Sequence, residues 1–470
     1  MNAKEKSTEP VADPRRIDPR LRKKYDVRGP RYTSYPPATH FGPIDSRQLF
    51  ERWQARNQLK DDPGLSLYCH IPFCRKRCLF CGCHTYAAKQ PAVVDAYLES
   101  LINEIQLAAR QVSPTRPVHQ VALGGGTPNF LTSKQLERLL SAMQSTWQVA
   151  AGAELSVEIN PRTSTAAKLD VFIKYGFNRF SLGIQDFSRT VLETIKRDQG
   201  LMEVDQVISY LRQNEIKSIN FDLIYGLPGQ SLASCRETID QVIDLRPSRI
   251  ALYSYAHVPW IHAHQKALER AGLPEPDLKA ALFLSMADRL VESGYQFIGM
   301  DHFALPDDPL TVALAERQLR RNFMGYTTGR GLDLLAFGAS AISSIGSAYS
   351  QNDKDLAGYQ TQLADNRLPV VRGYLLNSDD LIRRELLMEL FCNFFVDFKA
   401  LSLQFDIEAA DYFAKDLEKL APLIADQLVS WTREAITVSD SGRFFIRNIC
   451  MTFDRHLEKD DSQRVYSRTV

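Results

Sequence analysis

Short apolar runs alternate with amphipathic stretches through the middle of the chain. The apolar runs, rich in β-branched and aromatic residues, lie at residues 65–71, 118–123, 154–159, 179–184, 218–225 and 249–256. Between them, apolar residues recur at helical spacing in segments 92–111, 133–147, 165–176, 201–214 and 234–246. Because neighbouring parallel strands are joined by crossovers that carry helices, this alternation predicts a parallel sheet covered by helices.

The strand pattern favours an α/β fold of the barrel type. We predict an open or closed β/α barrel over residues 49–300, with a doubly wound sheet as the structural alternative. In both folds ligands bind at the carboxyl ends of the strands. The residues that follow each predicted strand are therefore the candidates for a binding site.

The two flanks of this region have other patterns. Residues 1–48 are rich in Pro, Arg, Tyr and Thr and predict an arm, whose aromatics (Tyr32, Tyr35 and Phe41) favour docking on the body over a disordered tail. After about residue 270 the pattern becomes helical, which predicts a mainly helical C-terminal domain over residues 301–470. A short strand pair at 428–433 and 435–440 precedes its last helix.

Composition and charge narrow the class of protein. The 470 residues are 44% hydrophobic and 24% charged, and 57 Lys and Arg against 56 Asp and Glu leave a net charge of +1. A near-neutral chain lacks the basic surface of a nucleic-acid binder. The N-terminus has no apolar signal segment, and no stretch reaches the roughly 18 to 20 apolar residues of a membrane span. We expect a soluble, cytoplasmic protein.

Cysteine spacing gives the first chemical indication. Three cysteines form a C-x3-C-x2-C motif directly after the first predicted strand, at Cys74, Cys78 and Cys81. Three thiolates are one short of the four ligands that a [4Fe-4S] cluster or a structural zinc requires, which suggests an iron left open for a ligand. A zinc site completed by Cys83 or His84, or unrelated surface thiols, are the alternatives. The isolated cysteines further along the chain are expected to be ordinary buried thiols.

Polar or small residues also follow the later strands. The glycines of residues 124–126 end the second strand, where bare backbone can approach a ligand closely, although a tight turn would need the same residues. Glu158 ends the third strand, and a carboxylate there is costly unless it has a partner or lies in water. Gln185, Arg197 and Asp222 lie on or after the next strands. Polar groups on successive strand ends indicate a site more often than separate structural roles.

These motifs together resemble the radical S-adenosylmethionine (SAM) superfamily. The matching segments are YCHIPFCRKRCLFCGC (68–83), GGGTP (124–128), the strand-end Glu158 and GIQD (183–186). Within that superfamily the chain is similar to the oxygen-independent coproporphyrinogen III oxidases. Further similar segments are GPRYTSYP (29–36), DLIYGLP (222–228), RNFMGYTT (321–328) and RNICMTFD (447–454). They extend from residue 24 almost to the C-terminus.

The resemblance implies a partial (β/α)6 radical SAM barrel with one [4Fe-4S] cluster on Cys74, Cys78 and Cys81 and with SAM on its fourth iron. By motif position, the residues implied at this SAM are Tyr68, Gly125, Glu158 and Ile342. A second SAM position is implied at Phe80, Gly126, Thr127, Gln185, Arg197, Asp222 and Ala256. Cys83 belongs to the family pattern without binding the cluster, and Cys69 stands where an apolar residue is expected.

The implied reaction converts two propionates of coproporphyrinogen III to vinyl groups and yields protoporphyrinogen IX. One electron enters the cluster and cleaves SAM, and the resulting 5′-deoxyadenosyl radical removes hydrogen from the propionate β-carbon before carbon dioxide leaves. A low-potential donor such as flavodoxin or ferredoxin, an unidentified electron acceptor and a monomeric enzyme are implied. Arg31 is a candidate carboxylate partner because guanidinium binds carboxylate bidentately. The arm that carries it would then be a lid whose deletion impairs turnover far more than stability.

Three other functions compete with this interpretation. A haem chaperone and a haem-degrading radical SAM methyltransferase belong to the same superfamily. The chaperones lack the position of Cys83 and the arm that ends in GPRYTSYP, and the match through RNICMTFD disfavours the methyltransferase. A zinc-stabilised winged-helix regulator would explain the helix, helix, hairpin, helix order at the C-terminus, but no basic recognition helix or polybasic arm accompanies it.

Overall fold

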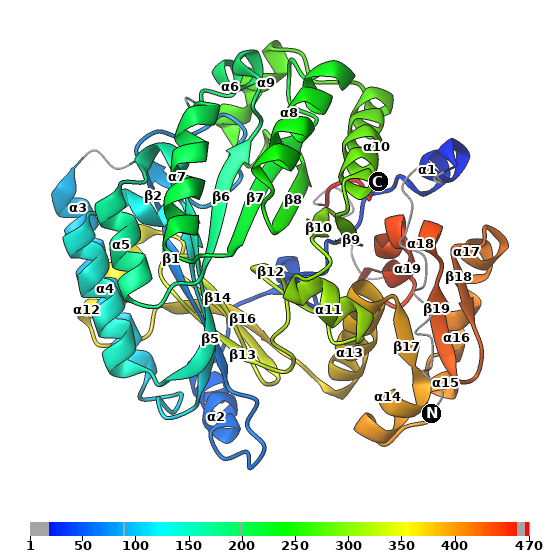
Figure 1. Cartoon of the computed structure of the whole chain (residues 1–470). Helices are drawn as coiled ribbons and strands as arrows, with labels where there is room; N and C mark the ends of the chain where they lie inside the picture. The colour runs from blue at the N-terminus through cyan, green and yellow to red at the C-terminus, as the bar shows by residue number, and fades with distance from the viewer. Residues whose placement is uncertain (1–17, 88–89, 198, 458–465, 470) are drawn as a thin grey trace, which may run out of the picture.

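A twelve-stranded sheet forms the body of the molecule. The computed structural model describes residues 18–87, 90–197, 199–457 and 466–469. Six neighbouring strands in the middle of the sheet are parallel and follow chain order (Figure 1): β1 (Leu65–Ile71), β4 (Val118–Gly125), β5 (Val149–Ile159), β6 (Arg179–Gln185), β7 (Ser218–Tyr225) and β8 (Arg249–Ser254). These are the six predicted strands.

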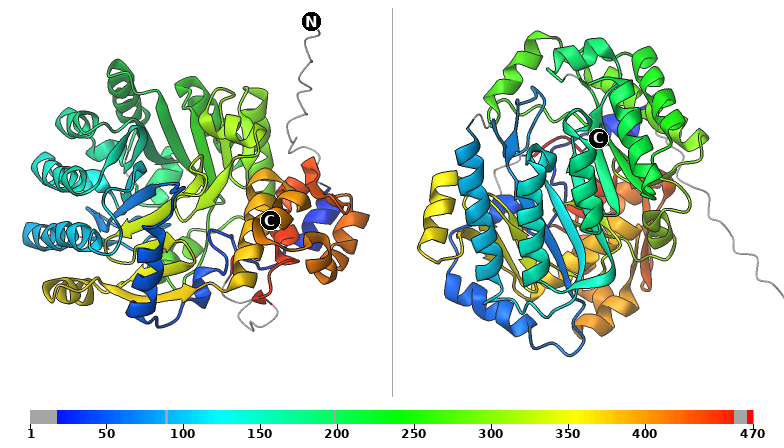
Figure 2. Two further views of the ribbon diagram at one scale, coloured as in Figure 1. Left: turned by 90° about the horizontal axis from the view of Figure 1, so that it is seen from below. Right: turned by 60° about the vertical axis from the view of Figure 1, so that its left-hand side comes forward.

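Helices cover the outer face of the curved sheet (Figure 2). They are α3 (Pro91–Ala108), α4 (Ser133–Thr146), α5 (Ala166–Lys174), α6 (Arg189–Thr194), α7 (Leu201–Gln213), α8 (Leu232–Leu245) and α10 (Pro276–Glu292). Alternate residues of β1, such as Leu65, Leu67 and Cys69, are fully buried in the core that these helices share with the strands. Burial of this continuous apolar layer stabilises the partial barrel, and the predicted fold class is confirmed.

The sheet continues beyond the six strands at both edges. At one edge lie β10 (His302–Ala304) and β9 (Gln296–Gly299), both antiparallel. At the other edge β13 (Asp333–Phe337) is parallel to β1, and it is followed by the antiparallel strands β14 (Ile342–Ile345), β15 (Ala348–Asn352) and β16 (Val370–Leu375). The mainly helical pattern predicted after residue 270 did not indicate these strands. Two of them, β13 and β15, are buried throughout and therefore show no alternation of apolar and polar residues.

The remaining elements complete the chain. Short pieces beside the barrel are α1 (Pro19–Tyr25), α2 (Ser46–Arg56), β2 (Phe73–Cys74), β3 (Tyr86–Ala87), α9 (Lys266–Arg270), α11 (Pro309–Ala315), β11 (Arg320–Asn322), β12 (Gly325–Thr327) and α12 (Leu356–Ala364). The C-terminal part contains α13 (Ser378–Asn393), β17 (Phe395–Asp397), α14 (Phe398–Phe405), α15 (Ala409–Tyr412), α16 (Ala414–Glu418), α17 (Ala421–Ala425), β18 (Val429–Trp431), β19 (Ala435–Val438), α18 (Asp440–Phe444) and α19 (Ile446–Met451). The predicted strand pair is confirmed as β18 and β19.

The C-terminal part lies at the open side of the barrel and has its own core (Figure 2). The N-terminal arm is part of this core, since Tyr32 and Tyr35 are 4% and 2% exposed and belong to the same apolar cluster. Tyr32 also donates a hydrogen bond to Asp454 at 2.9 Å. These tyrosines belong to residues 18–48, the part of the predicted arm that the structure describes, whereas residues 1–17 lie outside the described residues. The depth at which Tyr32 and Tyr35 are buried contradicts the expectation that removing the arm costs little stability. In the described part of the chain, helices that could span a bilayer are absent.

Candidate active site

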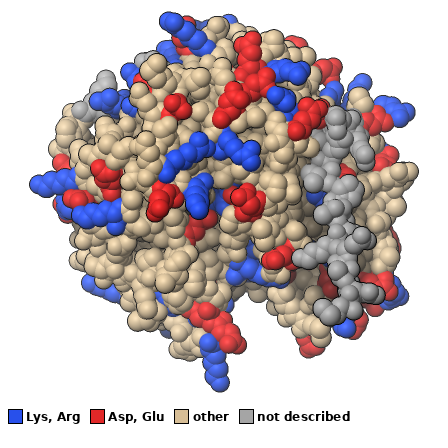
Figure 3. All heavy atoms as spheres, viewed as in Figure 1, with Lys and Arg blue, Asp and Glu red and all other residues tan. Residues whose placement is uncertain are grey.

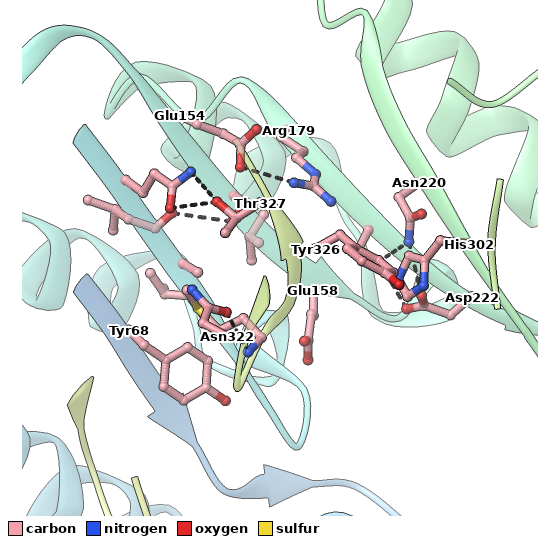
Figure 4. Close-up of a pocket in the computed structure, with 18 of the residues that line it drawn as sticks. Tyr68, Glu154, Glu158, Arg179, Asn220, Asp222, His302, Asn322, Tyr326 and Thr327 are labelled. Atoms are coloured by element: carbon pink, nitrogen blue, oxygen red, sulfur yellow. Dashed lines mark hydrogen bonds and ion pairs between the residues drawn. The ribbon is translucent and has the colours of Figure 1, made fainter. Parts of the chain in front are cut away.

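The interior of the barrel is polar and contains a cavity of about 110 Å³. Strand residues point alternately outward into the core and inward into this space, and on β5 the inward positions are Glu154, Ser156 and Glu158. Residues of all six parallel strands line this cavity, which Figure 4 shows in close-up. The labelled residues are Tyr68, Glu154, Glu158, Arg179, Asn220, Asp222, His302, Asn322, Tyr326 and Thr327.

Most of these polar side chains form ion pairs or hydrogen bonds with one another. Arg179 on β6 forms an ion pair with Glu154 at 3.0 Å. On the other wall, Asp222 accepts hydrogen bonds from Ser181 at 2.9 Å and from Asn220 at 2.9 Å (Figure 4). These contacts fix the strand interiors in one arrangement, as buried polar networks do when every member has a partner.

Glu158, like Asp222 and unlike Glu154, has no ion pair with a cation in the described structure. Its Oε2 accepts a hydrogen bond from the Gly125 backbone at 3.1 Å, and its carboxylate opens into the cavity. Enclosure within the barrel, together with the negative charge of Asp222, raises the pKa of Glu158 to about 7. Burial also raises the pKa of Asp222. The pair can therefore accept hydrogen bonds or hold a proton near neutral pH.

The glycine run at the end of β4 is required by close approach. A Cβ on Gly124 would lie 2.9 Å from the Glu158 carboxylate, and one on Gly126 would lie 2.8 Å from the Phe73 carbonyl oxygen. Gly125 has φ +109°, which side chains rarely allow. These contacts bring β4, the cysteine segment and Glu158 together at the carboxyl end of the barrel.

The cysteine motif lies in a loop between β2 and β3, at that same end. The loop is fixed by backbone contacts, since Leu79 N–H donates to the Ile195 carbonyl at 3.1 Å and Gln265 donates to the Phe80 carbonyl at 3.1 Å. The His264 ring nitrogen Nε2 lies 2.9 Å from the carbonyl oxygen of Cys81. Because these contacts hold the loop in place, the three thiols lie at one edge of the barrel.

The thiols of this loop are chemically suited to bind iron. Cys74, Cys78 and Cys81 are partly buried, whereas Cys83 is exposed. A hydrogen bond from Cys83 lowers the pKa of Cys81 to about 6. Burial raises the pKa of Cys78, and the guanidinium of Arg197, 3.9 Å from its Sγ, opposes that rise. Thiolate is the form that binds metal.

A single-ion site is not preformed in the described residues, where no three His, Cys, Asp or Glu side chains are grouped to hold one metal ion. The zinc alternative would need such convergence on one ion. A cubic iron–sulfur cluster bonds each cysteine to a different iron, so it does not need the three sulfurs to meet at a point. A [4Fe-4S] cluster therefore requires a looser grouping of three thiols than a single zinc ion does.

Several predicted residues do not line the barrel cavity, and of these Thr127 and Arg197 contact the cysteine loop. Thr127 Oγ1 lies 3.4 Å from Cys74 Sγ, and Arg197 also donates to the Gly183 carbonyl. Gln185 is buried with a positive φ of 72°, and Ala256 is exposed beyond β8. Ile342 packs with Phe41 and Tyr349 on the far side of β13. The SAM-binding roles of all the residues named for them remain predictions.

The other cysteines lie away from the loop ligands. Cys69 is fully buried with its Sγ 3.6 Å from the sulfur of Met143 on α4, so it occupies the helix-covered face of β1. Cys235, Cys392 and Cys450 are also buried, as expected for isolated thiols.

The guanidinium of Arg31, predicted to bind a substrate carboxylate, is already paired with a carboxylate of the protein. Its guanidinium forms an ion pair at 2.6 Å with Asp301, a buried residue that also contacts the His302 ring at 2.6 Å. Arg31 could reach a substrate only by exchanging or sharing this partner. Its substrate role remains a prediction.

Sequence reasoning missed the contribution of the β11–β12 hairpin. This hairpin places Asn322, Met324, Tyr326 and Thr327 against the barrel cavity. It also borders a second, larger cavity of about 430 Å³ on the side of the C-terminal part. The paired polar residues Glu154 and Arg179 were detectable as polar positions at period two in otherwise apolar strands, but nothing in the local pattern of the hairpin indicates that it faces the barrel.

Comparison with known proteins first defines the class. Residues 68–242 match the radical SAM superfamily, and residues 376–445 match the HemN C-terminal domain. The partial barrel with its cysteine loop at the carboxyl end of β1 is thus that of a radical SAM enzyme.

The particular family follows from matches over the whole chain. The chain is 43% identical over 450 residues to the oxygen-independent coproporphyrinogen III oxidase of Escherichia coli (strain K12), covering 96% of this chain and 98% of that protein. It is 42% identical to the protein of the same name from Synechocystis, covering 96% and 97%. The solved structure of the Escherichia coli coproporphyrinogen III oxidase, described as a radical SAM enzyme, matches with a TM-score of 0.87 at 40% identity over 94% of this chain and 99% of that chain. The chain belongs to the oxygen-independent coproporphyrinogen III oxidase family.

Proposed function

We propose that this enzyme decarboxylates two propionate side chains of coproporphyrinogen III to vinyl groups and so forms protoporphyrinogen IX. The observation that carries the proposal is the position of the cysteine loop, at the same end of the barrel as Glu158 and the glycine run of β4. For each propionate, the β-carbon loses one hydrogen atom, the carboxylate leaves as carbon dioxide, and one further electron passes to an acceptor. The relatives that match over the full chain carry the corresponding name.

The proposed cofactors are one [4Fe-4S] cluster and two molecules of SAM. When bound, they supply a one-electron reduction and a carbon-centred radical that abstracts hydrogen. We assign cluster binding to Cys74, Cys78 and Cys81, whose thiols lie in one ordered loop. Arg197, next to Cys78, would offset the negative charge of a bound cluster.

The barrel residues would bind and orient SAM. Glu158 has an accepting carboxylate that opens into the cavity and lacks a cation, which suits it to accept hydrogen bonds from ribose hydroxyls. Tyr68 and Asp222 line the same cavity. Gly125 and Gly126 leave space for the close approach of a ligand at the strand end, since neither carries a side chain.

The chain's other role would be to exclude water from the radical. The β11–β12 hairpin covers one side of the barrel interior, and Tyr326 on it packs against the His302 ring with centroids 5.2 Å apart. Water excluded in this way cannot quench a reactive intermediate. A low-potential electron donor such as flavodoxin or ferredoxin, an electron acceptor and a monomeric state complete the proposal.

The decisive test is anaerobic turnover. The protein is reconstituted with iron and sulfide and incubated with SAM, a reductant and coproporphyrinogen III. We expect protoporphyrinogen IX and two carbon dioxide molecules per product. A protein that binds haem without decarboxylating the substrate would instead support the chaperone alternative, and methyl transfer from SAM would support the haem-degrading methyltransferase.

A further inference from the structure

The larger cavity of about 430 Å³ lies between the barrel and the C-terminal part. Its wall includes Arg56 at the end of α2 and Leu381, Arg384 and Met388 on α13. Figure 3 shows the surface hollowed at its lower edge, between the places where Figure 1 draws α2 and α13. The cavity therefore lies on the side from which a large ligand could enter.

This cavity adjoins the one inside the barrel. Gln120, Asn322 and Thr327 line both of them. A molecule held in the larger cavity would therefore lie next to the barrel interior, whose lining includes Glu158 and Tyr68.

Four arginines line the larger cavity, and two of them are neutralised by carboxylates. Arg56 forms an ion pair with Asp333 at 2.8 Å. Arg320 forms ion pairs at 2.8 Å with both Glu385 and Glu389. These two arginines thus have structural partners and little charge left for a ligand.

The other two, Arg321 and Arg384, have no ion pair with any carboxylate in the part of the chain that the structure describes. Arg321 is 8% exposed, and its Nε and Nη1 have no hydrogen-bond partner among the described residues. Its guanidinium lies 5.0 Å from the Tyr326 ring centroid and 5.2 Å from that of Phe391. Arg384 donates one hydrogen bond, to the Gly346 carbonyl at 3.1 Å.

A buried guanidinium without an ion pair is expensive, because it loses hydration and has no carboxylate in direct contact. The buried carboxylate of Asp301 attracts Arg321 from a longer range and offsets part of that cost. Aromatic faces on two sides compensate only part of that loss and hold the fork in a fixed plane. Such a group is arranged to receive a planar anion in two parallel hydrogen bonds.

We propose that Arg321 and Arg384 bind propionate carboxylates of the tetrapyrrole substrate in this cavity, so that another propionate enters the barrel. This inference rests on the proposed function. It places the cationic groups for a tetracarboxylate on β11 and α13, outside the parallel strands. Two fixed positive groups would orient the macrocycle as well as attract it.

The test measures binding to the reconstituted enzyme with cluster and SAM. The probe is coproporphyrin III, the stable oxidised form of the substrate, followed by fluorescence quenching, and the comparison ligand is its tetramethyl ester. Arg321→Met and Arg384→Met should each weaken coproporphyrin III binding by roughly tenfold or more, as loss of a charge-assisted hydrogen bond does. Binding of the ester should not change. The matched control is Arg330→Met, an exposed arginine that does not line the cavity.

Arg321→Lys keeps the charge but not the two-pronged geometry and should recover part of the affinity, while the KM for coproporphyrinogen III should follow the binding constant. Wild-type turnover with unchanged affinity in both Met variants would overturn the inference. A wild-type enzyme that does not convert coproporphyrinogen III would instead overturn the proposed function. If Arg321→Met does not fold, the inference is tested with Arg321→Lys and Arg384→Met. If the role of Arg321 were purely structural, Arg321→Lys would have a lower melting temperature but an unchanged affinity for coproporphyrin III.

Discussion

The two parts of the twelve-stranded sheet are built on different principles. The six parallel strands β1 and β4 to β8 are joined by helices, and each contributes residues both to the apolar core and to the lining of the barrel cavity. The strands that extend the sheet, β9, β10 and β13 to β16, are short, and β13 and β15 are buried throughout. The cysteine loop and Glu158 belong to the first part, whereas the arginines of the larger cavity lie on α2, β11 and α13, outside the parallel strands.

This difference suggests a division of roles. The parallel barrel presents groups for a cofactor at one end, as parallel α/β folds generally do. The irregular elements close the open side and determine the size and charge of the space that a substrate would occupy. Changes in the barrel should therefore affect cofactor chemistry, and changes in the elements that close its open side should affect substrate binding or stability.

The largest expected effect is loss of the cluster in Cys78→Ser. A serine oxygen is a poor replacement for a thiolate in iron–sulfur ligation, so cluster content and turnover should fall to background. Iron analysis and visible absorption under anaerobic conditions measure this. Cys235→Ala, at a buried position on α8, should keep its cluster. A fully loaded Cys78→Ser protein would mean that the motif is not the cluster site.

The second prediction concerns Tyr35, which lies in the core of the C-terminal part and not in the barrel. Tyr35 is 2% exposed in the C-terminal core, so Tyr35→Ala should lower the free energy of unfolding by about 3 to 5 kcal/mol, as for other buried aromatic truncations. Chemical denaturation of the holoprotein gives the value, and the folded fraction should still carry a cluster. Leu403→Ala, at a 77% exposed position, should change stability by less than about 0.5 kcal/mol. Equal effects of the two variants would show that the arm is not part of the core.

The part of the fold that the sequence predicted is the part with a regular repeat. Each of the six parallel strands is apolar and is separated from the next by a helical segment. The predicted and observed bounds agree within about two residues for five of them, whereas β5 begins at Val149 instead of residue 154. The short strand β13 could not be predicted because it has five residues, all buried, and its pairing with β1 depends on contacts between residues far apart in the chain. Pairing of this kind leaves no local periodicity.

The candidate site divides in the same way. The cysteine spacing, the glycine run and Glu158 were detectable because they are unusual residues at predicted strand ends. Asn322 and Tyr326 were not, since their approach to the barrel depends on how the β11–β12 hairpin folds back over it. The pairing of Arg31 with Asp301 was likewise beyond the sequence, because 270 positions separate the two residues.

The third prediction tests Glu158 as a SAM ligand. Glu158→Ala should weaken SAM binding by about tenfold or more and leave the cluster assembled, because one acceptor of charge-assisted hydrogen bonds is lost. Since the carboxylate has a pKa of about 7, affinity of the wild-type protein for SAM should fall as pH drops below that value and the group takes up a proton. Glu158→Gln should remove this pH dependence. Equilibrium binding of SAM gives both results, with Glu193→Ala, an exposed helix carboxylate, as control.

A SAM affinity that is unchanged in Glu158→Ala would limit Glu158 to a structural role at the glycine run. A pH dependence that persists in Glu158→Gln would assign the titration to another group, and Asp222, whose pKa burial also raises, is the first candidate.

The smallest expected effect measures how strongly the β11–β12 hairpin, a separate two-stranded sheet, is coupled to the parallel barrel. Gln120 on β4 and Thr327 on β12 exchange buried hydrogen bonds of 2.7 and 3.1 Å between side chains separated by 207 positions. A double-mutant cycle with Gln120→Met and Thr327→Val should give a coupling energy of about 1 kcal/mol in the free energy of unfolding. The coupling energy should be favourable, because each single change leaves a buried polar group without its partner, whereas the double change removes both polar groups. A coupling energy near zero would mean that the hairpin rests on the barrel without energetic connection, and that the boundary between the two cavities depends on the C-terminal core alone.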